Sequence, residues 1–137
     1  MSSFARAASA VAACLAVIVL AGCAANPGVG SVSRGVPDGV TLDPFSEGPA
    51  AVWIDRGESF AVVTLGSSSC PAMATEVSAS RDDRVSVTFG PSPSTTCTAD
   101  MAPTTHTFDL PAGVSGDAIS VEIHFEEWPE VYTIALD

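Results

Sequence analysis

Beyond residue 49 the apolar positions of the chain mostly follow a period of two, and helical spacing is nowhere sustained. β-Branched and aromatic residues, which favour strands, dominate this part of the sequence. Because successive side chains of a strand point to opposite faces, the pattern predicts a series of short, half-buried strands. We expect seven of them, over residues 51–54, 59–65, 75–80, 84–89, 106–110, 118–126 and 131–136.

The alternation also predicts which strand faces point inward. Three sets of apolar residues each share one face: Val85, Val87 and Phe89; Val121, Ile123 and Phe125; and Tyr132, Ile134 and Leu136. The run 60–65 is nearly all apolar, which indicates a central strand covered on both sides or one flanked by a docked tether.

The connections favour antiparallel neighbours. Residues 55–58, with Gly57, and the polar residues 81–83 both predict hairpin turns. Pro129 is expected outside the ladder, because proline cannot donate a backbone hydrogen bond. Seven short strands in under ninety residues predict an all-β fold, an immunoglobulin-like antiparallel β-sandwich, with a partly open Greek-key barrel as the alternative.

The first 22 residues have a different character. Arg6 is their only charge, and an apolar stretch rich in small residues follows it. That stretch has about 14 residues, fewer than the roughly 20 that a membrane-spanning helix needs. Residues 1–22 therefore predict a cleaved export signal rather than a permanent span.

The end of this signal, Leu20-Ala21-Gly22-Cys23, resembles the lipobox of bacterial lipoprotein precursors. The resemblance implies that the Cys23 thiol receives a diacylglycerol and that the signal is cut before it. It also implies that the new amino terminus is often acylated too, with fatty acids such as palmitate. Two or three acyl chains give stable attachment where a single chain binds only marginally. The alternative is a small residue at an ordinary cleavage site.

Residues 23–49 are dense in Gly, Pro and Ser and have no apolar period. Such a stretch buries too little to offset the entropy of ordering it, so it predicts a flexible tether before a domain over residues 50–137. Val40, Leu42 and Phe45 could instead dock as a first edge strand.

Two cysteines remain for the domain, since Cys14 lies in the signal and Cys23 would carry lipid. Cys70 and Cys97 form an even pair in an exported chain, so a disulfide is expected. Closing a loop of about 28 residues would stabilise the fold by roughly 3–4 kcal/mol. A redox or metal pair is the alternative, although the spacing is not Cys-x-x-Cys.

The segments Gly66-Ser67-Ser68-Ser69-Cys70-Pro71 and Cys97-Thr98-Ala99-Asp100-Met101 are similar to parts of uncharacterised small actinobacterial lipoproteins. The resemblance rests on these two short motifs and implies no activity.

Charge narrows the choice of partners. The chain has 16 acidic and 5 basic residues, a net charge of -11, and loss of Arg6 with the signal leaves 4 - 16 = -12. This balance argues against nucleic-acid binding and favours basic partners or loosely held divalent cations.

Candidate chemistry is sparse. Ser67, Ser68 and Ser69 lack a Gly-x-Ser-x-Gly elbow, so that no catalytic residue or cofactor is expected, although His106 or His124 and Asp100 or Asp109 offer possible partners. His106 shares a face with Phe108 and Leu110 and is expected to be half-buried.

A metal site is the sharper alternative. Glu122, His124 and Glu126 alternate on one strand and could bind zinc or copper, but they equally match the solvated face of a half-buried strand.

Trp128 lies near four acidic residues, Glu126, Glu127, Glu130 and Asp137. If exposed, it could contact a basic or sugar-like ligand; otherwise it covers one end of the core. The sequence thus predicts a lipid-anchored protein on the extracytoplasmic face of the cell membrane, carrying a binding or interaction module. A metal-binding lipoprotein and a cell-wall hydrolase or transferase are the alternatives.

Overall fold

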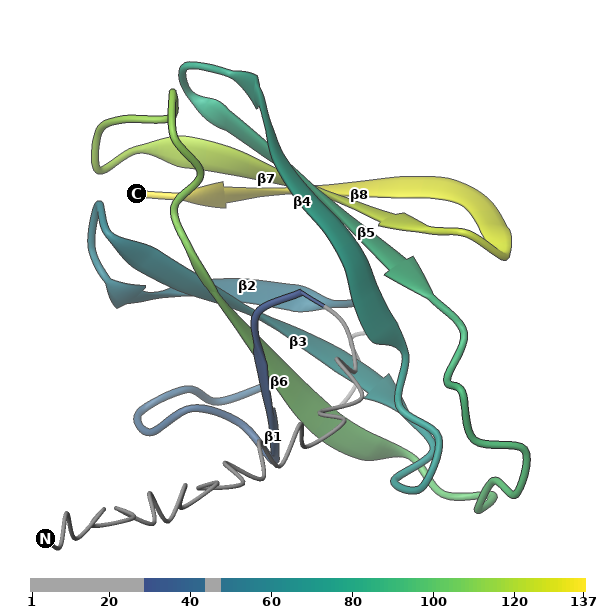
Figure 1. Cartoon of the computed structure of the whole chain (residues 1–137). Helices are drawn as coiled ribbons and strands as arrows, with labels where there is room; N and C mark the ends of the chain where they lie inside the picture. The colour runs from purple at the N-terminus through teal and green to yellow at the C-terminus, as the bar shows by residue number, and fades with distance from the viewer. Residues whose placement is uncertain (1–28, 44–47) are drawn as a thin grey trace, which may run out of the picture.

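The computed structural model describes residues 29–43 and 48–137, and every regular element in these ranges is a β-strand (Figure 1). The eight strands are β1 (Ser31–Arg34), β2 (Ala50–Asp55), β3 (Ser59–Gly66), β4 (Met73–Arg81), β5 (Arg84–Gly90), β6 (Ala102–Asp109), β7 (Ile119–Phe125) and β8 (Trp128–Leu136).

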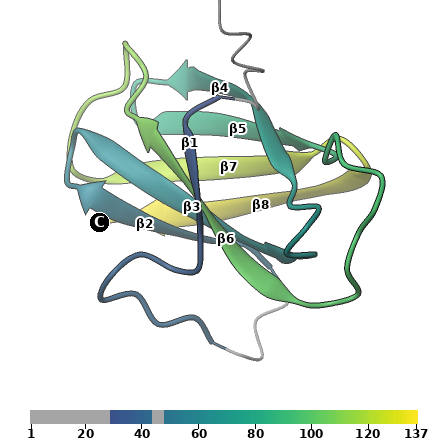
Figure 2. The same cartoon turned by 60° about the horizontal axis from the view of Figure 1, so that its bottom comes forward.

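The strands form two four-stranded sheets, one in the order β1-β6-β3-β2 and the other in the order β4-β5-β7-β8. Figure 2 shows the two sheets lying over each other as layers. Since no described strand belongs to both sheets, the fold is an open β-sandwich and not a closed barrel. The all-β sandwich prediction is confirmed.

One pair of strands departs from the antiparallel arrangement that we expected. β5 and β7 pair in parallel, with Val85 opposite Val121 and Phe89 opposite Phe125. The reason is that β6, which lies between them in sequence, belongs to the other sheet. The chain crosses to that sheet, runs back along it and returns, so that β7 takes the direction of β5.

Most predicted strands are close to the observed ones, but two begin earlier than predicted, β6 at Ala102 and β8 at Trp128. The hairpin turns are confirmed, with Gly57 at φ 78° in the first of them. Pro129 lies inside β8, at an irregularity where neither it nor Glu130 has a partner on β7. The missing donor is therefore accommodated without loss of a ladder hydrogen bond.

The core lies between the sheets. Its buried members come from both layers and include residues of the inward faces predicted for β5 and β7, and Tyr132 and Ile134 pack at the margin. The twelve buried members are Phe60, Val62, Ala74, Val85, Val87, Phe89, Phe108, Val114, Ile119, Val121, Ile123 and Leu136. Ala61 and Val63, on the outer face of β3, are also buried. The central position predicted for β3 is confirmed by its pairing with β2 and β6.

The stretch predicted to be a tether contains strand β1, which differs from our expectation. Ser31–Arg34 pairs with the outer edge of β6, and the Val29 N–H donates to the Ala74 carbonyl on the other sheet at 2.9 Å. β6 would otherwise expose a free edge, and pairing that edge outweighs the weak strand pattern of these four residues. Val40 and Leu42 are half-buried outside any strand, and Phe45 lies outside the described residues.

Gly30 lies between Val29, which bonds to one sheet, and Ser31, where the strand paired with the other sheet begins. A substitution at Gly30 therefore tests this docking. Its φ is +80°, and an added Cβ would lie 2.5 Å from the Thr107 carbonyl oxygen, whereas Gly35, at φ +87°, has open space around it. We expect Gly35→Ala to cost about 1–2 kcal/mol of unfolding free energy from backbone strain alone. Gly30→Ala adds overpacking of about 1–3 kcal/mol. Urea unfolding measures both, and equal costs would show that the segment is not docked.

Candidate functional site

Three connections lie at one end of the sandwich, which we call the loop end. They are residues 67–72, 91–101 and the turn 126–127 (Figure 1). The strand registers require this, because Gly66 lies opposite Ala102 and Phe89 lies beside Phe125. The loop end contains Trp128, the cysteine pair and the serine run that the sequence singled out.

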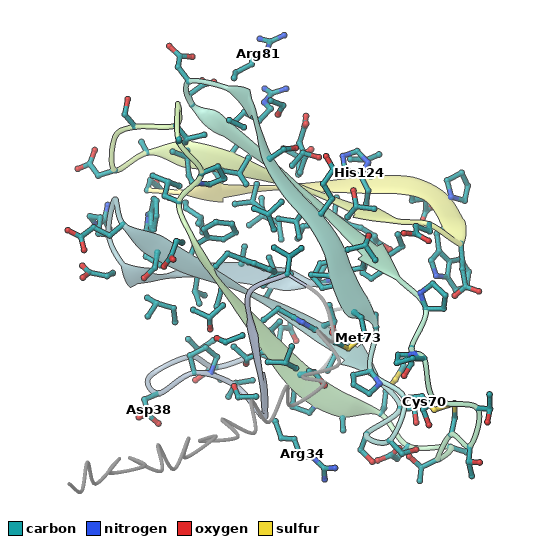
Figure 3. All side chains as sticks on the ribbon, viewed as in Figure 1. Arg34, Asp38, Cys70, Met73, Arg81 and His124 are labelled. Atoms are coloured by element: carbon teal, nitrogen blue, oxygen red, sulfur yellow. A yellow bond between two sulfur atoms is a disulfide. The ribbon has the colours of Figure 1, made fainter. Side chains whose placement is uncertain are left out.

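A disulfide joins Cys70 to Cys97, as predicted, with a Cα–Cα distance of 5.2 Å. Figure 3 places Cys70 at this end of the molecule. Cys70 lies in the crossing from β3 to β4 and Cys97 in the crossing from β5 to β6. Each crossing runs from one sheet to the other, so the bond ties together the two connections that cross between the layers at this end.

The serine run next to Cys70 forms a hydrogen-bond network with the opposite loop. The Thr98 hydroxyl lies 3.0–3.2 Å from the hydroxyl oxygens of Ser67, Ser68 and Ser69, and it also donates to Asp100. Asp100 accepts the Ser68 backbone N–H at 3.0 Å. Hydrogen bonds from the Ser68 and Thr98 side chains lower the pKa of Asp100 to about 2. Ser67, Ser68 and Ser69 therefore hold the loop 67–72 against the loop 91–101.

The two histidines lie away from this network. His106 was expected to be half-buried, but it is wholly buried and contacts Phe89 with a ring-centroid distance of 4.8 Å. Its Nε2 lies 3.3 Å from the Thr64 hydroxyl, while Nδ1 has no hydrogen-bond partner. Burial lowers the pKa of His106 to about 4, which keeps the imidazole neutral. His106 is a core residue and does not reach a serine.

The row Glu122, His124 and Glu126 does not converge. Glu122 forms an ion pair with Arg84 at 3.0 Å, and Glu126, beyond the end of β7, accepts a hydrogen bond from Thr75 at 3.0 Å. His124 lies on the outer face of the sheet (Figure 3). Within residues 29–43 and 48–137 no three His, Cys, Asp or Glu side chains are placed to share a metal ion. These contacts match the solvated-face interpretation of the row.

Trp128 is 67% exposed at the start of β8, and Val131 beside it is also exposed. The indole does not cover the core, which was the alternative interpretation. Glu126, Glu127 and Glu130 share this hairpin, but Asp137 does not, because Leu136 pairs with Ile119 at the opposite end of β7. The exposed Trp128 therefore shares its hairpin with three glutamates, and Asp137 lies elsewhere.

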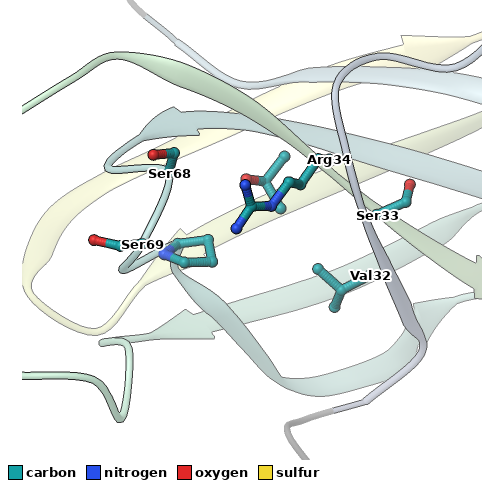
Figure 4. A pocket seen from close by; sticks show the side chains of 7 residues that line it. Val32, Ser33, Arg34, Ser68 and Ser69 are labelled. Carbon is teal, nitrogen blue, oxygen red and sulfur yellow. The ribbon is translucent and has the colours of Figure 1, made fainter. Parts of the chain in front are cut away.

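A pocket that the sequence did not indicate lies between β1 and the loop 67–72 (Figure 4). It has a volume of about 430 Å³ and is lined by Val32, Ser33, Arg34, Ser68, Ser69, Pro71 and Thr104. Three of these residues come from β1, inside the predicted tether. No sequence signal could have found the pocket, because it exists only when β1 pairs with β6.

Comparison with known proteins identifies no relative: no family model, curated protein or solved structure matches the chain. None of the residues described by the structure belongs to a helix long and apolar enough to cross a membrane.

Removal of the disulfide should weaken the fold strongly. The bond closes a sequence separation of 27 residues, so we expect the Cys70→Ala/Cys97→Ala double variant to lose about 3–4 kcal/mol of unfolding free energy. Urea unfolding of the variant and of reduced wild type measures the loss, and the two should agree. A loss below about 1 kcal/mol would contradict the role of the bond as a staple between the crossings.

His106 should make stability depend on pH. Its pKa is about 4 in the fold and 6.5 ordinarily, so the unfolded chain binds the proton first as the pH falls. Stability is complete above pH 6.5 and is lost as the pH falls toward 4, by on the order of 2 kcal/mol at pH 4.5. Urea unfolding at pH 7 and 4.5 should show a smaller loss for His106→Gln. The exposed-face control His124→Gln should retain the wild-type loss, and identical losses in all three proteins would contradict the assignment.

Proposed function

We propose that this protein is a lipoprotein held to the extracytoplasmic face of the cell membrane by lipid on Cys23, and that its β-sandwich is a binding module. The location is supported by the Leu20-Ala21-Gly22-Cys23 sequence after a short apolar segment. The Cys70–Cys97 disulfide supports it independently, because disulfides persist mainly in oxidising compartments outside the cytoplasm.

Binding is favoured over catalysis by the arrangement of the loop end. Its serine hydroxyls are engaged by Thr98 and Asp100, and neither histidine is within reach of them as a base. What the end offers is an exposed indole, a pocket, and loops tied by a disulfide and a hydrogen-bond network. Rigid loops on a sandwich are a general way to present contact residues.

The anchor would also hold the module near the bilayer. Val29, the first described residue, lies six positions after Cys23, and an extended chain spans at most about 3.5 Å per residue. The sandwich would therefore remain within about 20 Å of the lipidated thiol. Its net negative charge opposes flat adsorption on anionic lipid, which leaves the loop end accessible.

The anchor is tested by substitution of its cysteine. We expect Cys23→Ala, expressed from the full precursor in a bacterium that processes lipoproteins, to accumulate uncut and to incorporate no fatty acid. The matched control Cys14→Ala keeps the lipobox and should be processed, labelled with palmitate and recovered with membranes. Mass spectrometry and membrane fractionation measure these outcomes, and an unlipidated, membrane-free wild type would refute the anchor.

A further inference from the structure

We propose that the pocket between β1 and the loop 67–72 binds a small molecule through an oxyanion, a carboxylate or phosphate group, and that Arg34 is the principal contact. The inference rests on the proposed binding function and names the ligand class. The observations that carry it are the guanidinium of Arg34, which has no carboxylate partner among the described residues, the chemistry of the lining and the fixed position of both walls.

Among the described arginines, Arg34 and Arg81 have no ion pair or side-chain hydrogen bond, and Arg34 is the one of these two that lines the pocket. Arg56 donates to the carbonyl oxygens of Asp117 and Asp137, and Arg84 pairs with Glu122. Arg34 has no carboxylate within ion-pair distance among the residues that the structure describes, although acidic residues outnumber basic ones 16 to 5. Figure 4 shows its guanidinium extended across the pocket toward Ser68 and Ser69. An anionic group there would meet a cation that has no carboxylate partner in the described part of the chain.

The rest of the lining suits a small amphipathic acid. It contains four hydroxyl-bearing residues, two apolar residues and no carboxylate. Arg34 presents a planar fork of donors that matches a carboxylate or a phosphate. Val32 and Pro71 offer apolar contact for the body of the ligand, and the hydroxyl of the nearly buried Thr104 can donate at the floor. Asp100, in the adjoining network, does not line the pocket and accepts hydrogen bonds from Ser68 and Thr98.

Both walls are fixed before any ligand arrives. On the β1 side, the Gly35 N–H donates to the Pro103 carbonyl at 2.9 Å, and the Gly35 carbonyl accepts the Thr105 hydroxyl at 2.7 Å. On the loop side, the Ser69 hydroxyl accepts the Thr98 N–H at 2.8 Å, next to the disulfide.

A preformed site loses little conformational entropy on binding, which favours affinity for a ligand that fits it. The volume of about 430 Å³ lies in the range of small-molecule sites.

The same oxyanion chemistry occurs in two sources near a membrane, soluble organic acids or phosphates and the phosphate of lipid headgroups. The test therefore uses the full chain in nonionic detergent micelles and three probes at constant ionic strength. These are sodium acetate, inorganic phosphate and short-chain phosphatidylglycerol. Backbone amide NMR shifts of Ser33, Arg34, Ser68 and Ser69 report occupancy of the pocket.

We expect saturable shifts at these residues with at least one probe, and at least tenfold weaker binding in Arg34→Ala. Arg81 is the matched control, because it is an exposed arginine at the β4–β5 turn, far from the pocket (Figure 3). Arg81→Ala removes the same charge and should leave the affinity unchanged, and Arg34→Lys should retain part of it. Dispersed spectra confirm that each variant folds.

Saturation by acetate or free phosphate would identify a soluble ligand, and saturation by phosphatidylglycerol alone would identify a lipid headgroup. No saturable shift with any probe, or equal weakening in Arg34→Ala and Arg81→Ala, would overturn the proposal. Failure of the anchor would be seen separately, as membrane-free wild-type protein in the fractionation experiment that includes Cys23→Ala and Cys14→Ala. The titration takes place in micelles and does not depend on that result.

Discussion

The arrangement of the molecule depends on the pairing of β6 along both of its edges. β3 pairs with one edge over its whole length, and β1 pairs with the other. Because β6 belongs to the other sheet, β5 and β7 lie next to each other and run parallel. The same pairing places His106 between the sheets and brings Thr104 to the floor of the pocket. The core, the sheet order and the candidate site thus share one strand.

The disulfide restrains the loop that leads into β6. The entrance to β6 is a loop of eleven residues, 91–101, and a loop of that length would have large conformational freedom if it were tied only at its ends. The Cys70–Cys97 bond and the Thr98–Asp100 hydrogen bonds fasten it to the loop after β3. A surface at this end can therefore be specific without a large apolar contact area.

The sequence pattern predicted those features of the fold that depend on residues close together in the chain. Alternation identified seven strands and their inward faces, since burial of one face requires period two. The turn at Gly57 and the pairing of Cys70 with Cys97 also follow from local chemistry. β1 was not predictable in this way, because Ser-Val-Ser-Arg is ordered only by the free edge of β6. The parallel pair of β5 and β7 follows from the sheet to which β6 belongs, which alternation does not encode.

The candidate site was predicted only in part, for the same reason. The cysteine pair and the serine run could be found in sequence, but the role of Arg34 depends on contacts across about seventy residues of chain, as between Gly35 and Thr105. The exposure of Trp128 depends on how the β7–β8 hairpin projects beyond the core. The depth of His106 depends on Phe89 from the opposite sheet.

The central claim is that β1 belongs to the folded unit and forms one fixed wall of the pocket. Amide hydrogen exchange on the full chain tests it most directly. The Gly35 and Val29 amides donate to Pro103 and Ala74, so we expect their exchange to be slowed to rates approaching those of the β3–β6 ladder. Exchange of both amides at the rate of an unstructured peptide, while the ladder remains protected, would show that β1 is detached and would contradict the account.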